Sequence, residues 1–248
     1  DVSCLISAIN QANANGQTNT IRLEAGVYTL DDINNINNGP NGLPSVTSTV
    51  VIAGAHAATT IIQRRASAPA FRILHVAATG RLVLNGLTLR GGRIPSAFAE
   101  GGGGMFNNSG AVTLSNTIFT HNVGEGLSNG GGAFSSGGTL TIADSLFEDN
   151  EAGNNGGGLA SGGAVTIIKS TFIRNVARGT GGIEHNGGIL TLVMSTLAYN
   201  RSEAGAGGLF SNASTLTIVN SSVLGNWSGS AAGGMFIASD LIMSNSAI

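Results

Sequence analysis

A glutamate and a histidine interrupt a stretch of the chain in which almost every other feature repeats. The segment TGGIEHNGGIL, residues 180–190, holds Glu184 and His185 where the corresponding segments hold Phe or Ala and then a small polar residue. Enzymes that act on polysaccharides use a carboxylate as general acid or base, or a cation that stabilises an enolate-like charge. Glu184, helped by Arg178 or Arg201 from neighbouring loops, therefore gives one hypothesis, a polysaccharide lyase or glycoside hydrolase.

Two observations weigh against catalysis by this segment. Adjacent residues of a strand point to opposite faces, so Glu184 and His185 share a cleft only if a corner falls between them. Acidic residues are sparse near Glu184, and no pair of carboxylates at the spacing of a glycosidase is evident. The leading hypothesis is therefore a binding surface without catalysis.

The sequence indicates neither a metal site nor a cofactor. The four histidines lie far apart and lack the spacing of zinc ligands: His56, His75, His121 and His185. The glycine runs at 101–104, 130–132 and 156–158 precede no helix and no Gly-Lys-Ser/Thr, so they are not phosphate-binding loops. They are typical of corners and of closely packed strand starts.

A repeat of roughly 26 residues organises the chain from Gly101 onward. An apolar residue follows the glycines at spacings of 28, 26, 24, 26 and 26, in the column Met105, Ala133, Leu159, Ile183, Leu209 and Met235. An apolar–Thr–apolar strand follows in each unit, and an asparagine closes it, in the column Asn122, Asn150, Asn175, Asn200 and Asn226. Three short strands and three corners per unit predict a parallel β-helix, with the asparagines stacked into a ladder.

Other repeat architectures fit the unit less well. Helical repeats are excluded because glycine is too dense and no 3.6-residue periodicity survives. A propeller blade needs roughly 40 residues and tight hairpins. A second corner column is mostly Asn or Asp, which tolerate the left-handed backbone of a sharp turn: Asn116, Asp144, Lys169, Met194, Asn220 and Asn245.

Strand parity predicts a column of aromatic side chains. The Met105 column contains no polar residue and should point inward, so the next position should point outward. That position holds Phe106, Phe134, Ala160, Glu184, Phe210 and Phe236. An exposed aromatic row with Glu184 at its middle would suit an extended polysaccharide. The alternative is that a bulge after the glycines places these rings in the core.

A second candidate column directly precedes the ladder asparagines: His121, Asp149, Arg174, Tyr199 and Gly225. At one coil spacing, His121 could pair with Asp149, and Asp149 with Arg174. We treat these side chains as candidate ligand contacts, with a solvated surface carrying weak ion pairs as the alternative. A recurrent threonine column gives little support to ice binding, because it is a single column.

The two ends of the chain differ from its middle. Residues 1–16 have the i, i+3, i+4, i+7 apolar spacing of a helix that Gly16 can end, and such a helix would cap the open end of a solenoid. Residues 17–100 predict irregular first coils with longer loops, and residues 101–248 regular coils of the same single domain. The last coil is incomplete, which favours either a fragment of a longer protein or end-to-end self-association.

Parts of the chain resemble known β-helix families. Residues 4–13 (CLISAINQAN), Gly16 and residues 20–30 (TIRLEAGVYTL) resemble the N-terminal cap of the CSLREA family, although Arg and Glu of that signature are absent. Three Phe-x-x-Asn units, at 119–122, 147–150 and 172–175, resemble the repeats of polymorphic outer-membrane proteins. These resemblances imply a right-handed β-helix on a secreted or surface-exposed bacterial protein, but no particular reaction.

Composition narrows the choice of partners. The net charge is −2 and the basic residues are scattered, so nucleic acid is not an expected partner. No apolar run reaches about 18 residues, so we expect no membrane-spanning helix. Cys4 is alone, which rules out an internal disulfide. The sequence therefore favours an adhesin-like scaffold that binds glycans or surfaces, with a carbohydrate-active enzyme as the alternative.

Overall fold

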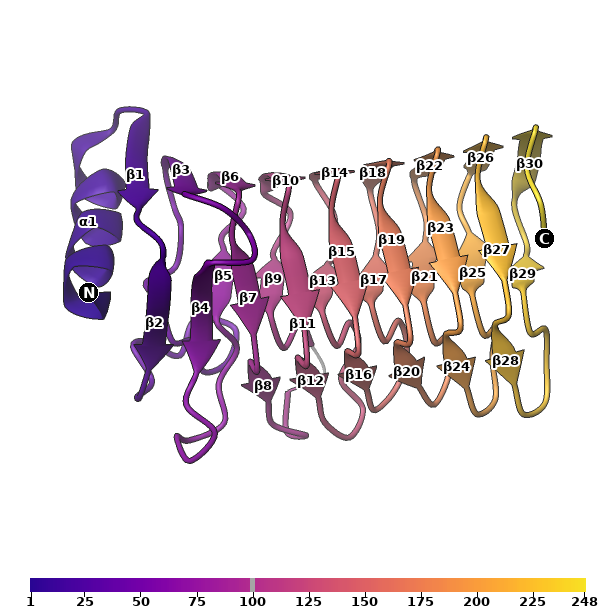
Figure 1. Cartoon of the computed structure of the whole chain (residues 1–248), viewed down its shortest axis with the longest axis horizontal. Helices are drawn as coiled ribbons and strands as arrows, with labels where there is room; N and C mark the ends of the chain where they lie inside the picture. Colours follow the sequence, from indigo (N-terminus) through magenta and orange to yellow (C-terminus); the bar gives the residue numbers. More distant parts are fainter. Residues whose placement is uncertain (99–100) are drawn as a thin grey trace.

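Stacked parallel strands follow a single N-terminal helix in the computed structural model, which describes residues 1–98 and 101–248 (Figure 1). The helix α1 (Val2–Asn15) begins at Asp1, whose carboxylate accepts a hydrogen bond from the Cys4 N–H, and ends at Gly16 with φ 67°. It buries Leu5, Ile9 and Ala12 against the first coil. The predicted capping helix is therefore confirmed, and it covers the strand edges at that end of the stack.

The strands form four parallel sheets along the described residues. The first sheet contains β1 (Asn19–Leu23), β3 (Thr49–Gly54), β6 (Arg81–Asn85), β10 (Ala111–Ser115), β14 (Thr139–Ala143), β18 (Ala164–Ile168), β22 (Ile189–Val193), β26 (Thr215–Val219) and β30 (Asp240–Ser244). The second contains β2 (Gly26–Leu30), β4 (Thr60–Arg64), β7 (Thr88–Arg90), β11 (Ile118–Thr120), β15 (Leu146–Glu148), β19 (Thr171–Ile173), β23 (Thr196–Ala198) and β27 (Ser222–Leu224).

The other two sheets complete each coil. The third contains β8 (Arg93–Ile94), β12 (Val123–Gly124), β16 (Glu151–Ala152), β20 (Val176–Ala177), β24 (Arg201–Ser202) and β28 (Trp227–Ser228). The fourth contains β5 (Leu74–Val76), β9 (Met105–Asn107), β13 (Ala133–Ser135), β17 (Leu159–Ser161), β21 (Ile183–Asn186), β25 (Leu209–Asn212) and β29 (Met235–Ile237).

The sequence predicts three strands per coil, whereas the regular coils of the described residues have four. The strands of the third sheet are two residues long and directly follow the ladder asparagines. Two residues are too few to show an alternation of apolar and polar side chains, so this strand leaves no readable pattern in the sequence. The repeat of roughly 26 residues and the solenoid itself are confirmed.

The residues of each repeat column predicted from the sequence pair with one another on neighbouring strands of one sheet. Ala133 pairs with Met105 and Leu159, and Ile183 pairs with Leu209, all at 0% exposure in the core. The rings of Phe119, Phe147 and Phe172 stack inside the solenoid with neighbouring centroids 4.6 Å apart. Like residues thus lie directly above one another, as expected for a solenoid.

An asparagine ladder (Asn122, Asn150, Asn175, Asn200 and Asn226) joins consecutive coils through the interior. The Asn150 Nδ2 donates to Asn175 Oδ1 at 3.0 Å and to the Phe119 carbonyl at 2.9 Å, and the Asn150 backbone N–H also donates to Asn175 Oδ1, at 3.1 Å. The same pattern recurs along the ladder. Each amide therefore satisfies the backbone groups that a sharp corner leaves unpaired in the core.

The ladder explains the glycine pair of each repeat. A Cβ on Gly132 would lie 3.2 Å from Asn150 Cγ and 2.5 Å from the Gly158 carbonyl oxygen. Only a residue without a side chain fits between a ladder amide and the backbone of the next coil. The corner column behaves as predicted, since Asn116, Asp144 and even Met194 have φ of 48–50°.

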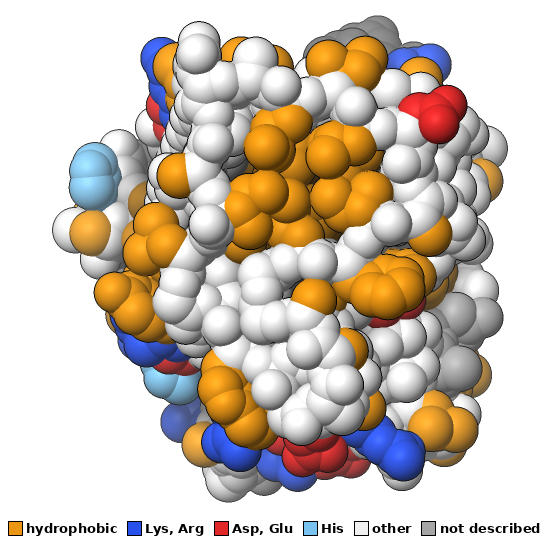
Figure 2. Space-filling view, turned by 90° about the vertical axis from the view of Figure 1, so that its right-hand side faces the viewer, with side chains coloured by type: hydrophobic (Ala, Val, Ile, Leu, Met, Phe, Trp, Pro, Cys, Tyr) orange, Lys and Arg blue, Asp and Glu red, His pale blue; other side chains and the backbone are white. Residues whose placement is uncertain are grey.

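The far end of the solenoid is apolar. Figure 2 shows orange side chains gathered in the middle of this end. Exposed apolar residues lie on or near the last strands, with fractions of 50% for Phe236, 59% for Ile242 and 64% for Ile248. Among the described residues, the only helix, α1, is too short and too polar to cross a membrane.

Replacement of Asn175 by alanine tests the ladder. The change leaves the Asn150 amide groups and the Phe147 carbonyl without their buried partners. We expect a loss of about 3 kcal/mol or more in the free energy of unfolding, measured by urea denaturation, because each unpaired buried group costs ~1–3 kcal/mol. The exposed Asn85→Ala should cost about 0.5 kcal/mol or less. Equal losses in both variants would contradict a stabilising role of the ladder.

Candidate functional site

Glu184 and His185 point to opposite faces of β21, as the strand parity predicts. Ile183 and His185 are both 0% exposed and face the interior, while Glu184 lies in the outward column. The register places Glu184 between Ala160 of β17 and Phe210 of β25. The two residues therefore do not form a dyad.

The outward column is aromatic, but its rings differ in exposure. Phe106 is 1% exposed, Phe134 and Phe210 are half-buried, and Phe236 is 50% exposed. The expectation that Phe106 is exposed is wrong because the buried Arg72 covers its ring, with the guanidinium carbon 5.0 Å from the ring centroid. Arg72 is held there by the Asn38 carbonyl at 2.8 Å and the Gly101 carbonyl at 3.0 Å.

A shallow groove opens in the middle of this column, where Ala160 leaves space between a ring and a carboxylate. Its volume is about 270 Å³, and it is lined by Asn129, Phe134, Ser135, Ser136, Asn155, Ala160, Ser161, Gly162, Glu184 and Asn186. This volume lies just below the ~300–1,000 Å³ of pockets that enclose a small molecule. The groove is thus suited to surface contact with part of a larger ligand. Amides, hydroxyls and one aromatic ring dominate its lining.

Of the described residues that line this groove, Glu184 is the only titratable one. The carboxylate accepts hydrogen bonds from Thr180 Oγ1 at 3.0 Å and from Asn186 Nδ2 at 2.7 Å, and the residue is 8% exposed. Burial raises the pKa of Glu184, and these two hydrogen bonds partly oppose the rise. A carboxyl group of this kind can accept hydrogen bonds from a ligand hydroxyl or, when protonated, donate one.

The two arginines suggested as catalytic partners do not line the groove. The Arg201 guanidinium carbon lies 4.9 Å from the centroid of the Trp227 ring, on the third sheet. Arg178 contributes its backbone carbonyl to a turn, where it accepts from the Ala204 N–H at 2.8 Å. Within the described residues, the groove holds a single carboxylate and no cation. The described lining thus supplies one of the groups that the hydrolase and lyase mechanisms use.

Residues 73–247 match a family model described as right handed beta helix region. The chain belongs to the right-handed β-helix family. No curated protein and no solved structure gives a match in the corresponding comparisons. This β-helix fold occurs both in adhesins and in polysaccharide-degrading enzymes, so family membership alone does not separate the two hypotheses. The finer resemblances, to CSLREA proteins and to polymorphic outer-membrane proteins, stay predictions.

His185 is a buried polar residue of the β-helix interior, which the sequence did not indicate. It occupies an inward position that neighbouring coils fill with Ser135, Ser161 and Ser211. Its Nδ1 lies 3.0 Å from Ser161 Oγ, and its Nε2 has no hydrogen-bond partner in the part of the chain that the structure describes. Burial lowers the pKa of His185 to about 4. Burial and then the charge of Arg72 lower the pKa of His75, likewise to about 4.

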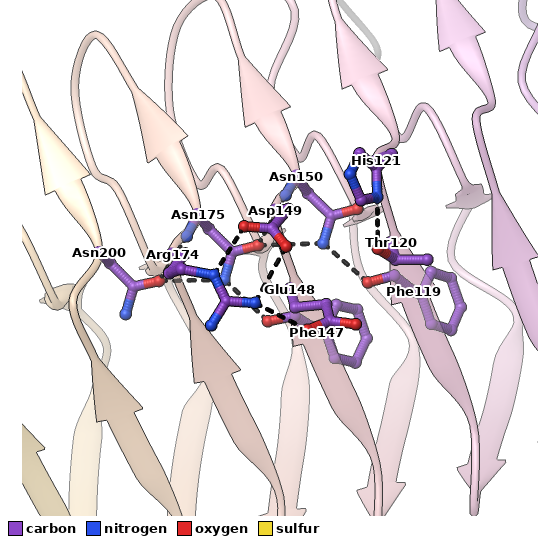
Figure 3. A network of polar contacts seen from close by, with 10 residues as sticks. All are labelled: Phe119, Thr120, His121, Phe147, Glu148, Asp149, Asn150, Arg174, Asn175 and Asn200. Carbon is purple, nitrogen blue, oxygen red and sulfur yellow. Dashed lines mark hydrogen bonds and ion pairs between the residues drawn. The ribbon is translucent and has the colours of Figure 1, made fainter. Parts of the chain in front are cut away.

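Each residue of the second predicted column directly follows a strand of the second sheet, at the corner that leads to the third sheet. Figure 3 shows His121, Asp149 and Arg174 of this column. Arg174 Nε and Nη2 donate to the two carboxylate oxygens of Asp149 at 2.9 and 3.0 Å, and Nη2 also donates to Glu148 at 2.9 Å. The hydrogen bond from Arg174 is the main cause that lowers the pKa of Asp149. The predicted Asp149–Arg174 pair is thus present, on an exposed edge where such pairs contribute little to stability.

The remaining residues of this column do not join the pair. His121 Nδ1 lies 2.7 Å from Thr120 Oγ1 and makes no direct bond to Asp149. Tyr199 is 60% exposed, and its ring lies over Gly225, where a Cβ would be 2.7 Å from Tyr199 Cε1. These positions have φ of 53–54° from His121 to Tyr199, and sequence reasoning had missed this left-handed corner.

The buried His185 should make stability depend on pH. The pKa of His185 is about 4 in the folded state against about 6.5 for an exposed histidine of the unfolded chain, so the unfolded chain binds a proton between these pH values and the folded chain does not. The contribution of the neutral His185 ring to the free energy of unfolding is therefore fully present above pH 6.5, and it is lost as the pH drops toward 4. We expect His185→Ser to remove about 3 kcal/mol of this loss, measured by urea unfolding between pH 7.5 and pH 4. Parallel pH profiles of the two proteins would refute this assignment.

Proposed function

We propose that this β-helix is a scaffold that binds neutral glycans along its fourth sheet, with contacts centred on the groove between Phe134 and Glu184. The observation that supports this most directly is the lining of the groove. A half-buried aromatic ring offers an apolar face to a sugar ring, and Asn155, Asn186 and Ser136 surround it with hydrogen-bonding groups. The Glu184 carboxylate supplies an acceptor for sugar hydroxyls.

The regular coils extend this surface along the axis. Phe210 and Phe236 stack with their centroids 5.6 Å apart on the next strands of the same column. Coils repeat every ~4.8 Å, so successive sugars of an extended chain would meet equivalent positions. The other candidate contacts, His121, Asp149, Arg174 and Tyr199, lie on the edge of the second sheet and would belong to a separate face. Phe106 contributes to the column only as a buried support.

A carbohydrate-active enzyme is the second candidate function, and the burial of Glu184 favours it. A carboxyl whose pKa is raised by burial keeps its proton to higher pH and suits a general acid. Against this, the described lining of the groove includes one carboxylate and neither Arg178 nor Arg201. We therefore rank binding above catalysis.

Binding and turnover of a glycan panel separate the two candidates. In calorimetry with a panel of neutral and uronic oligosaccharides, binding of the neutral members should weaken about tenfold in Phe134→Ala, which corresponds to roughly 1.4 kcal/mol, since a truncated central aromatic removes most of the contact. Trp227→Ala, on the third sheet, is the matched aromatic control and should bind normally. Product analysis with the same panel tests catalysis.

The outcomes differ for each candidate. Binding without product formation, retained in Glu184→Gln, supports the scaffold. Product formation that Glu184→Gln abolishes supports the enzyme instead. Absence of both binding and turnover across the panel would overturn both. Secretion or surface exposure in bacteria, implied by the family resemblances, would be tested by labelling intact cells, and a purely intracellular signal would contradict it.

We also propose end-to-end self-association of this chain through its apolar C-terminal coil (Figure 2). Leu241 continues the inward column of Leu216 and is 43% exposed on β30, whose outer edge carries unpaired backbone groups. Leu241→Lys should weaken dimerisation at least about tenfold in sedimentation experiments, because a buried unpaired charge is costly. Ile189→Lys places the same charge on the first sheet far from this end, at a side chain that is 52% exposed. A monomer at all concentrations would refute the proposal.

A further inference from the structure

A second groove, on the N-terminal half of the solenoid, is strongly basic. It has a volume of about 440 Å³, and Arg64, Arg65, Arg90 and Arg93 line it together with His121. The chain has 11 basic side chains in all, so four of them lie in this one groove although the net charge is −2. The sequence did not reveal this gathering, because the residues come from β4, β7 and β8 and become neighbours only through the stacking of coils.

Two of these guanidinium groups are held in place by uncharged acceptors. Arg64 Nε donates to the Gly91 carbonyl at 3.0 Å, and its Nη1 donates to the Ala68 carbonyl at 2.7 Å. Arg90 Nε donates to Gln63 Oε1 at 3.0 Å, and Arg90 Nη2 donates to the same oxygen. Gln63 is itself oriented by a hydrogen bond from its Nε2 to Thr29 Oγ1 at 3.0 Å. Both arginines are therefore positioned without being neutralised.

The other two guanidinium groups are paired with carboxylates, Arg65 with Asp31 and Arg93 with Glu125. In the part of the chain that the structure describes, no carboxylate pairs with Arg64 or Arg90. The groove therefore has an excess of positive charge. Burial first, and the charge of Arg93 second, lower the pKa of Arg64, and the charge of Glu125 partly opposes this shift.

We propose that this basic groove binds an acidic polysaccharide through its carboxylate or sulfate groups. Fixed guanidinium groups suit both kinds of oxyanion, because they can donate two parallel hydrogen bonds. Arg64 and Arg90 lie on consecutive coils, with His121 on the coil after them, so the groove follows the axis and can meet a repeating chain. The site is distinct from the groove at Glu184 and does not depend on the function proposed there.

Nucleic acid fits this groove less well than an acidic polysaccharide. Proteins that bind single-stranded nucleic acid combine basic grooves with aromatic side chains on which bases stack. The lining of this groove includes no phenylalanine, tyrosine or tryptophan among the described residues. The net charge of −2 also gives no extended basic surface that would follow a phosphate backbone.

Replacement of Arg90 tests the site. Binding of oligogalacturonate and of heparin oligosaccharide to the full chain would be measured by calorimetry at low and at 0.5 M NaCl, the first probe carrying carboxylates and the second sulfates as well. We expect Arg90→Gln to weaken binding of the preferred probe about tenfold, and added salt to weaken binding in the unmodified chain. Arg22→Gln is the matched control, because Arg22 is an exposed arginine on β1 of the first sheet, outside this groove, and its replacement should change affinity less than about twofold.

Further variants keep each outcome decisive. Gln63→Leu retains every charge but removes the acceptor that orients Arg90, so a partial loss of affinity with normal thermal unfolding would support positioning by Gln63. Phe134→Ala should leave binding of both acidic probes unchanged, which separates this site from the glycan groove. Absence of binding to both probes at low salt, an equal loss in Arg22→Gln, or tighter binding of a single-stranded RNA of similar charge would each overturn the proposal.

Discussion

Hydrogen bonding within the asparagine ladder is the constraint on which the rest of this molecule depends. From Asn122 to Asn200, each ladder amide is buried and pairs with the amide of the next coil and with the backbone on either side of a corner. A change in coil length or rotation would leave several of these groups unpaired at once. The glycine pair lies against the same amides, so the packing of the asparagine in each coil depends on the glycines beside it.

Because the ladder fixes the register, the side chains that face outward are free to differ from coil to coil. The candidate functional groups lie on these outer faces. A residue at a given coil position always lies beside its equivalents, roughly 4.8 Å away. In this way Ala160 opens a groove between Phe134 and Glu184, and Arg174 reaches Asp149 on the coil before it. The same stacking gathers the arginines of β4, β7 and β8. Single residues at equivalent positions of consecutive coils thus form extended surfaces.

The sequence predicted those features that depend on periodicity. The Met105 and ladder columns, the outward direction of Glu184 and the Asp149–Arg174 pair all follow from counting positions in a repeat. Features that depend on irregular segments were not predictable in this way. Arg72 covers Phe106 because the first coils have longer connections, and a repeat carries no information about them. The basic groove was missed for the same reason, since Arg64 and Arg65 precede the regular coils.

The two departures from the repeat at β21 have different physical meanings, although they are neighbours in sequence. The Ser161 hydroxyl lies 3.3 Å from the Glu184 carbonyl oxygen and 3.0 Å from His185 Nδ1. Both contacts are satisfied when the hydroxyl donates to the carbonyl and accepts from the imidazole N–H, which leaves Nε2 as an unpaired acceptor. Burial disfavours protonation and lowers the pKa of His185 to about 4, although a hydrogen bond with the Gly187 backbone partly opposes the shift, so the ring is neutral at pH 7. His185 therefore holds β21 to β17 from inside, beneath the groove that Glu184 lines from outside, and it supports that site without sharing its chemistry.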